Sequence, residues 1–220
     1  MAPAASSEQR RPLNRDRILR AAIELADAEG IDALTMRALA ANLHVEAMSL
    51  YNHVDGKDDL LDGMVEQVAA EVEEPSGDAG WRASLRERAT SLHRVLVEHP
   101  WSSMLWASRI TLGPARLRLM DGMLRDLRRA GFAPGLLDLA FHTVNNHIVG
   151  HALQHASFPF EVDELPAMSA RYLEDFPAAD YPDLAAHIRY HLQSADGDGS
   201  SFDFGLTAIL DALEASPTST

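Results

Sequence analysis

Apolar residues recur along this chain with the period of an amphipathic helix, beginning with Ile18, Ala22 and Leu25. No segment alternates apolar and polar residues as a half-buried strand would. Glycine, proline and aspartate breaks divide the pattern. It predicts helices over residues 14–30, 35–43, 46–52, 57–74, 81–98, 101–111, 114–130, 134–156, 166–175, 182–194 and 201–214. The predicted fold class is therefore all-α.

Two of the predicted helices are short and follow one another closely. Thr35 is a good N-cap for the first, and a three-residue break, Leu43-His44-Val45, separates it from the second. Two short helices joined by such a turn, after a supporting helix, are typical of a helix-turn-helix. The sequence thus predicts a flexible arm over residues 1–13, a three-helix helix-turn-helix DNA-binding head over 14–60, and a larger helical body over 61–220.

A helix-turn-helix places the outward face of its second helix in the major groove, with phosphate-gripping groups on either side. The outward residues here are Ala47, Met48, Ser49 and Asn52. The flanking candidates are Arg37, Tyr51, His53 and Lys57. Lys57 is the only lysine in the chain, and it begins a predicted helix, where backbone N–H groups also favour an anion.

These residues resemble the DNA-binding signature of the TetR family of bacterial transcriptional repressors. The resemblance is carried by Arg17-Ile18-Leu19, Ala21-Ala22, Leu25-Ala26, Gly30, Leu34-Thr35-Met36-Arg37-Ala38-Leu39-Ala40, Leu43-His44-Val45, Ser49-Leu50-Tyr51-Asn52-His53-Val54, Lys57 and Leu60-Leu61. The body resembles the tetracycline-repressor branch more loosely, at Trp81, residues 147–153 and residues 202–214. The resemblance implies a DNA-binding head and a divergent ligand-binding body.

The resemblance also implies roles for single residues. Base or groove contacts fall to Arg37, Ala47, Met48, Ser49 and Asn52, and phosphate contacts to Thr35, Tyr51, His53 and Lys57. Because alanine and methionine cannot hydrogen-bond a base edge, hydrogen-bonded readout would rest on Arg37, Ser49 and Asn52, with Met48 against a thymine methyl. The family usually has glycine where this chain has His44, so we expect a left-handed turn residue there at some steric cost.

The body carries a row of histidines, His147, His151 and His155, at helical spacing. Spacing by four can bring two imidazoles to one zinc or nickel ion, which leaves a metal site or a metal-dependent hydrolase as alternatives. Asp138 is the only acidic residue near the row, and no HExxH motif or comparable set accompanies it. A pocket lining or a dimer seam is the favoured interpretation, and we predict no enzymatic activity, no metal and no cofactor.

An apolar cavity between the body helices would take a small effector. Its candidate lining residues are His93, Trp101, Met104, Trp106, Met120, Phe132, Phe141, Asn145, His147 and His151. Taken singly, such a residue is more often part of a simple core. The resemblance places Thr111 and Gln154 where tetracycline-binding relatives hold the drug's magnesium. Neither is a comparable ligand for a hard cation, so we expect a different effector.

Residues 140–157 and 201–214 have more apolar positions than one helix face needs. In the TetR family these regions pair across a two-fold axis into a four-helix bundle, so the resemblance implies an isologous homodimer. The predicted function is a transcriptional regulator, a repressor released from a palindromic double-stranded DNA operator by an unidentified small-molecule effector. An activator, or a regulator that needs no ligand, remains open on the same fold.

Composition limits the alternatives. The 220 residues include no cysteine, which excludes disulfides and thiolate metal sites. No run of apolar residues is long enough for a membrane span or a signal peptide, so we expect a cytoplasmic protein.

The net charge of −14 at first opposes a DNA partner, but residues 1–60 carry only −3 and residues 61–220 carry −11. Five arginines fall within 10–20, either as a solvated arm or as phosphate attractors. Non-specific DNA binding should therefore be weak and salt-sensitive.

Overall fold

The protein is helical throughout the part that its computed structural model describes, which is residues 12–75, 80–157, 171, 173, 176–193 and 199–216. In chain order the helices are α1 (Arg15–Glu29), α2 (Met36–Leu43), α3 (Ala47–Leu50), α4 (Lys57–Ala70), α5 (Trp81–Glu98), α6 (Ser102–Ser108), α7 (Pro114–Arg129), α8 (Pro134–Ser157), α10 (Pro182–Gln193) and α11 (Gly199–Glu214). No strand forms within these residues, and the predicted all-α fold class is confirmed. The predicted arm and the helix predicted over 166–175 fall mostly outside the described residues.

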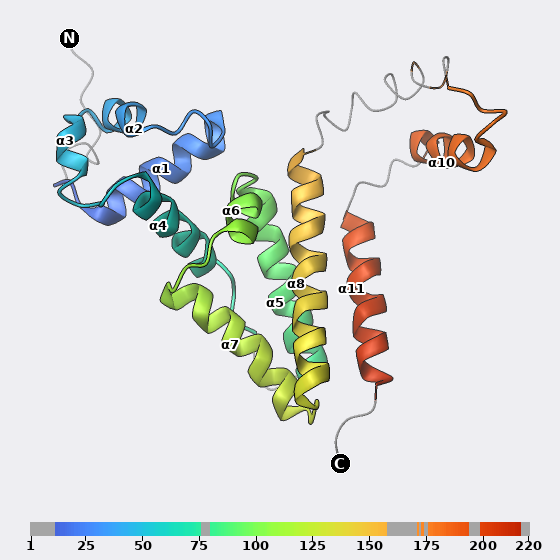
Figure 1. The fold of residues 1–220 in the computed structure, drawn as a ribbon. Helices are drawn as coiled ribbons and strands as arrows, with labels where there is room; N and C mark the ends of the chain where they lie inside the picture. Colours follow the sequence, from blue (N-terminus) through green and yellow to red (C-terminus); the bar gives the residue numbers. More distant parts are fainter. Residues whose placement is uncertain are drawn as a thin grey trace, which may run out of the picture.

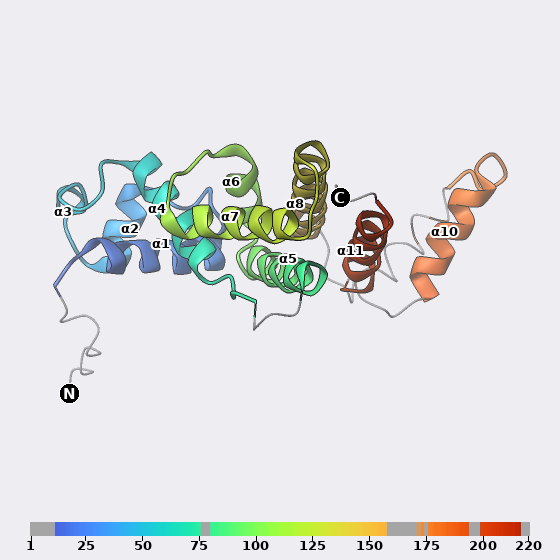
Figure 2. The ribbon, with the colours of Figure 1, turned by 90° about the horizontal axis from the view of Figure 1, so that it is seen from below.

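The helices form a small head, α1 to α4, and a larger body built around α5, α6, α7, α8 and α11 (Figure 1). Seen from below, α11 lies beside α8 and α5, and α10 lies beyond α11 (Figure 2). Each part has its own apolar core. Leu39 and Leu50 are fully buried in the head, and Leu92, Ile148 and Leu206 are nearly or fully buried in the body.

Helix α4 contributes to both cores. Its residues Leu60 and Met64 are buried among the head helices, whereas Val65 and Ala69 are buried in the body. The helix is continuous across the boundary that the sequence predicts between residues 60 and 61. Since a helix with side chains packed on both sides moves as one unit, a shift of α4 against the body also shifts the head.

Local capping explains where the first helices begin. The Asn14 side chain accepts a hydrogen bond from the backbone N–H of Arg17 at 2.9 Å, and the Thr35 hydroxyl accepts one from Ala38 N–H at 3.0 Å. Helix α2 ends at His44, whose backbone is left-handed with φ 56° and ψ 43°. Among the described residues it is the only non-glycine with positive φ, so the expected left-handed turn is confirmed.

Three helices are shorter than the hydrophobic pattern predicts. Helix α3 ends at Leu50, and the next residues form a turn in which His53 and Val54 donate their backbone N–H groups to Leu50 O at 2.9 and 3.0 Å. Helix α4 ends at Ala70 rather than near residue 74. Helix α6 ends at Ser108 rather than 111, because Arg109 takes an extended backbone and turns its side chain toward α4.

Candidate DNA-binding surface and effector-binding body

The head presents α3 as a short exposed ridge on a buried support. Leu50, on the inner side of α3, is fully buried and packs with Leu39 of α2, and Val54 closes the turn after it. Met48, on the outer side, is 73% exposed. The inner face fixes this four-residue helix to the head, and the outer face is free to enter a major groove.

The residues predicted to contact DNA gather around this ridge. Exposed side chains among them are Thr35, Arg37, Met48, Tyr51, Asn52 and Lys57, and half-buried ones are Ala47, Ser49 and His53. Thr35 also caps α2 through its hydroxyl, which fixes that oxygen at the first turn of the helix. The arrangement offers an apolar tip, polar groups beside it and a cation at the start of α4.

An ion pair that the sequence does not reveal orients the turn after α3. Arg15 of α1 forms two hydrogen bonds to the Asp59 carboxylate at 2.6 and 2.7 Å and donates to His53 O at 3.2 Å. The Arg15 hydrogen bond holds the pKa of Asp59 below its usual value, and the same bond raises the pKa of Arg15. Arg15 therefore ties α1 to the start of α4, and it is not part of a free arm.

The body brings three of the predicted effector residues together around one phenylalanine. The Phe202 ring of α11 stacks on His93 of α5 at a centroid distance of 3.8 Å and on His147 of α8 at 5.0 Å. His93 Nε2 and His151 Nδ1 share a hydrogen bond at 2.8 Å, and His147 Nε2 donates to Phe202 O at 2.9 Å. His155 is exposed. No group of three or more potential metal ligands forms among the described residues.

The other candidate effector residues do not gather at one place. Trp106 is buried under the Arg116 guanidinium, which lies 4.7 Å from the centre of the indole ring. Burial lowers the pKa of that guanidinium. Met104 is 56% exposed, Asn145 is half-buried, and Met120, Phe132 and Phe141 pack in or against the body core. Trp101 packs in the head core instead, with its Nε1 donating to Asp27 of α1 at 2.7 Å.

A second polar attachment joins α4 to the segment between α6 and α7. Arg109 donates to Asp62 at 2.5 Å and to Asp58 at 3.1 Å, and the Asp62 hydrogen bond raises the pKa of Arg109. One helical turn further on, Glu66 accepts the backbone N–H of Ala115 at 2.6 Å and so caps α7. A Cβ on Gly113 would lie 1.9 Å from a Glu66 oxygen, so the Glu66 side chain can take this position only beside a glycine.

The sequence patterns find the residues of the α3 ridge but miss those that hold it in place. Arg15, Glu66 and Arg109 have partners between 38 and 51 residues away, and no short motif marks such pairs. Phe202 lies within the segment on which the resemblance rests, but no pattern assigns it to the histidine row. Each of them is a single charged or aromatic side chain whose partner lies far along the chain, and the residue type alone does not identify that partner.

None of the helices in the described residues is both long enough and apolar enough to cross a membrane.

A helix-turn-helix with an exposed second helix, joined by a shared helix to an all-helical body, defines a DNA-binding transcriptional regulator. Family models agree with the geometry. Residues 18–64 match the model of bacterial regulatory proteins of the tetR family, and residues 74–216 match the tetracyclin repressor-like C-terminal domain. The chain belongs to the TetR family.

Individual relatives extend over nearly the whole chain. An HTH-type transcriptional repressor, DrrR1 of Streptomyces coeruleorubidus, is 36% identical over 213 residues, covering 92% of this chain and 77% of the relative. The class G tetracycline repressor protein of Vibrio anguillarum is 28% identical, covering 92% and 94%. The solved structure of the Streptomyces coelicolor TetR family protein ActR in complex with actinorhodin is similar with a TM-score of 0.75 and 32% identity, covering 93% of this chain and 96% of that one.

Proposed function

We propose that this regulator represses transcription by binding a palindromic operator as a homodimer and that a small molecule in the body releases it. The observation that carries the proposal is the α3 ridge, whose inner residue Leu50 is fully buried while Met48 is 73% exposed. A bacterial chromosome lies in the cytoplasm, so this is where we expect the protein to act. Binding and release, not chemical conversion of the effector, are its proposed activity.

At the DNA, we assign distinct roles to the exposed side chains. Arg37, Ser49 and Asn52 can donate or accept hydrogen bonds at base edges, and Met48 offers an apolar surface to a thymine methyl group. Thr35, Tyr51, His53 and Lys57 are proposed to hold phosphates and so to set the register of α3 in the groove, which Ala47 lines. The 46% exposure of Tyr51 leaves its hydroxyl accessible for such a contact.

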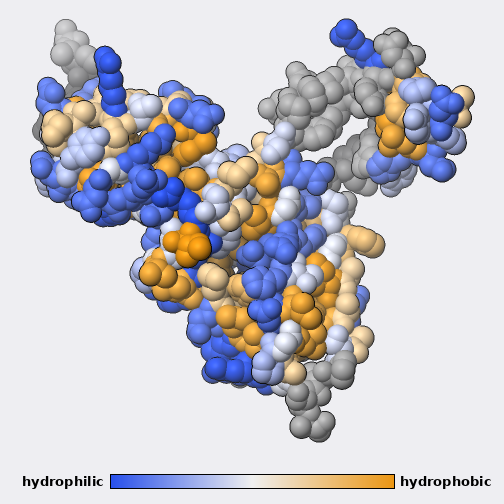
Figure 3. Space-filling model, in the orientation of Figure 1, coloured by the Kyte–Doolittle hydropathy of each residue, from blue (hydrophilic) through white to orange (hydrophobic). Residues whose placement is uncertain are grey.

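The homodimer is proposed to form through α8 and α11. Leu139 of α8 is 64% exposed and Phe204 of α11 is 78% exposed, although both residues are large and apolar. Hydrophobic residues also gather at the surface over the body in the view of Figure 3. Exposed apolar residues on two adjacent helices favour burial against a second copy, and a two-fold axis would present two α3 ridges to two half-sites.

For the effector, we propose a site in the body near the cluster of His93, His147, His151 and Phe202 and near Trp106. Stacked rings and imidazole nitrogens suit a planar ligand with polar groups. The relative ActR has been solved with actinorhodin and an Acinetobacter baumannii TetR variant with minocycline, so bodies of this kind accept small molecules. The Thr111 hydroxyl is within 3.4 Å of Arg116 Nη1, which argues against a magnesium ligand at that position.

The test uses duplexes selected from a random pool by the purified full-length protein. Fluorescence anisotropy then compares the selected duplex with one of identical composition and scrambled order. The proposal predicts a selected sequence with two-fold symmetry and at least a roughly thousandfold preference over the scrambled duplex, as specific regulators show. Equal affinity for both duplexes would contradict it.

A further inference from the structure

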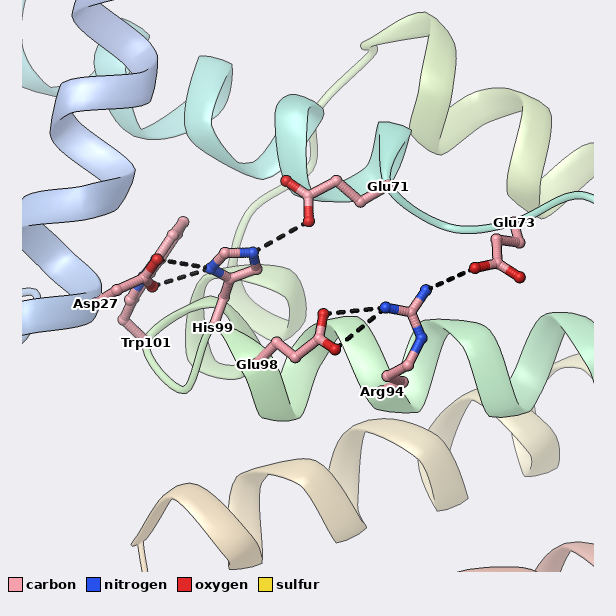
Figure 4. Close-up of polar contacts among 7 residues, drawn as sticks. All are labelled: Asp27, Glu71, Glu73, Arg94, Glu98, His99 and Trp101. Atoms are coloured by element: carbon pink, nitrogen blue, oxygen red, sulfur yellow. Dashed lines mark hydrogen bonds and ion pairs between the residues drawn. The ribbon is translucent and has the colours of Figure 1, made fainter.

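A histidine lies where the head, the end of α4 and the end of α5 meet. His99 follows α5 directly, and its ring is sandwiched between two carboxylates from other elements (Figure 4). Nδ1 lies 2.9 and 3.0 Å from the two oxygens of Asp27 on α1, and Nε2 lies 3.2 Å from Glu71, the C-cap of α4. The side chain is only 13% exposed.

Both contacts can be hydrogen bonds only when the ring is doubly protonated. A neutral imidazole carries one N–H, so one ring nitrogen would then direct a lone pair at a carboxylate. Asp27 is also fixed from the other side, because Trp101 Nε1 donates to it at 2.7 Å. The proton on His99 thus completes a bridge from α1 through the ring to α4.

The remaining charged groups around the bridge are already paired. On its own helix, Glu98 accepts two hydrogen bonds from Arg94 at 3.1 Å, and Arg94 also binds Glu73 at 3.2 Å (Figure 4). Glu73 is two residues from Glu71, but it faces Arg94 and not the imidazole. Within the part of the chain that the structure describes, the carboxylates that contact the His99 ring are those of Asp27 and Glu71.

We propose that His99 is a positioning residue for operator binding, whose doubly protonated ring fixes the DNA-binding head on the body. This inference rests on the proposed function, because it concerns how the head is presented to DNA. A head that is already fixed in one orientation loses less conformational entropy on binding DNA than a mobile head does. Its affinity for the operator is therefore higher. Loss of the proton releases one of the two carboxylates and loosens the bridge.

The direction of the pH dependence follows from the surroundings of the ring. Burial by itself lowers the pKa of His99, but the hydrogen bonds to Asp27 and Glu71 outweigh it and raise the pKa above its ordinary value. A raised histidine pKa contributes its full stabilisation below the unfolded pKa of about 6.5 and loses it as the pH rises through the folded value. Operator affinity should fall over the same interval.

The experiment compares Glu71→Gln with its matched control Glu73→Gln in the full chain. Both changes remove one negative charge within three residues, but only the first removes a partner of His99. NMR titration of the His99 ring measures its pKa without DNA, and anisotropy measures the dissociation constant for the selected duplex at pH 6 and pH 8. We expect Glu71→Gln to lower the His99 pKa and to weaken operator binding about fivefold at pH 6, at the low end of couplings between sites. The loss of affinity should be smaller at pH 8 than at pH 6.

Glu73→Gln should retain both the His99 pKa and the pH profile of the unaltered protein, and His99→Gln should reproduce the loss seen with Glu71→Gln. The residues near the DNA are the same in all four proteins, so any contribution they make to the pH profile cancels in the comparison. Identical profiles for Glu71→Gln and Glu73→Gln, or an unraised His99 pKa, would overturn this inference while leaving operator binding intact. A protein that prefers no duplex at either pH would instead overturn the proposed function, and this inference with it.

Discussion

The head is attached to the body at two ends of α4, and the two attachments differ in chemistry. Near the start of α4, Asp58 and Asp62 hold Arg109, which stays charged at every physiological pH. At its end, Glu71 and Asp27 hold His99, whose charge depends on pH. The attachment at the start of α4, which we call permanent, therefore fixes the helix to the body at every physiological pH. The attachment at its end, which we call conditional, is complete only while His99 is protonated.

The largest loss of stability beside the permanent attachment should come from Gly113→Ala, where Glu66 of α4 meets the start of α7. The added Cβ would lie 1.9 Å from a Glu66 oxygen, so the Glu66 side chain would have to move and give up the hydrogen bonds that it accepts from the backbone N–H groups of Ala115 and Arg116. We expect a loss of about 2–3 kcal/mol in the free energy of unfolding, as for overpacked sites, measured by urea titration. Gly135→Ala is the control, because a Cβ there meets nothing within 4 Å. A loss as large in Gly135→Ala would show that the Glu66 contact is not the cause.

Arg37→Ala tests whether attachment and DNA contact are separate. Arg37 is exposed beside the α3 ridge and belongs to neither attachment. Its removal should weaken binding of the selected duplex by about 1–3 kcal/mol and leave the free energy of unfolding nearly unchanged. Anisotropy and urea titration on the same preparation give the two values. Unaltered affinity would remove Arg37 from the proposed contact surface.

Arg109→Gln should remove the ion pairs of the permanent attachment while keeping a polar side chain of similar length at this position. The loss of charged hydrogen bonds to Asp62 and Asp58 is expected to cost about 1.5 kcal/mol of unfolding free energy. Because Arg109 does not titrate, the cost should be equal at pH 6 and pH 8. Arg20→Gln serves as the control, since its exposed pair with Asp16 within one helix is worth only about 0.3–0.5 kcal/mol. If the loss of unfolding free energy in Arg109→Gln varied with pH, the two attachments would not differ in pH dependence as proposed.

His99→Gln should have the smallest effect and the only one that depends strongly on pH. We expect a loss of about 1 kcal/mol in unfolding free energy at pH 6, because the charged hydrogen bonds are strong only while the ring is protonated. The loss should shrink as the pH rises through the raised pKa of His99. Urea titrations at several pH values measure it. A constant loss across this range would indicate a packing role for the ring.

The sequence predicts the head better than the attachments for a physical reason. Caps such as Asn14 and Thr35, and the left-handed His44, act on neighbours within four residues, so their effect can be read from the local pattern. The same holds for the periodic burial of Leu39 and Leu43. Helix α3 is shorter than its pattern predicts, because a tertiary turn at Leu50 ends it early.

The attachments depend on contacts between distant residues. His99 meets Asp27 across 72 residues, and no periodicity links them. Trp101 illustrates the same limit, because its apolar indole suggested an effector pocket, whereas the fold directs it to Asp27 and the head core. The predicted effector residues that do gather, His93, His147 and His151, come from two helices whose pairing the chain alone does not specify.

Repression by a homodimer requires two α3 ridges that contact two half-sites of one duplex. Hydroxyl-radical footprinting of the selected duplex tests this directly, because it maps protected sugars one by one. We predict two protected patches on one face of the DNA, related by two-fold symmetry and centred about 10 base pairs apart, one helical turn. In Arg37→Ala both patches should weaken together. A single patch, or protection spread evenly along the duplex, would contradict the account.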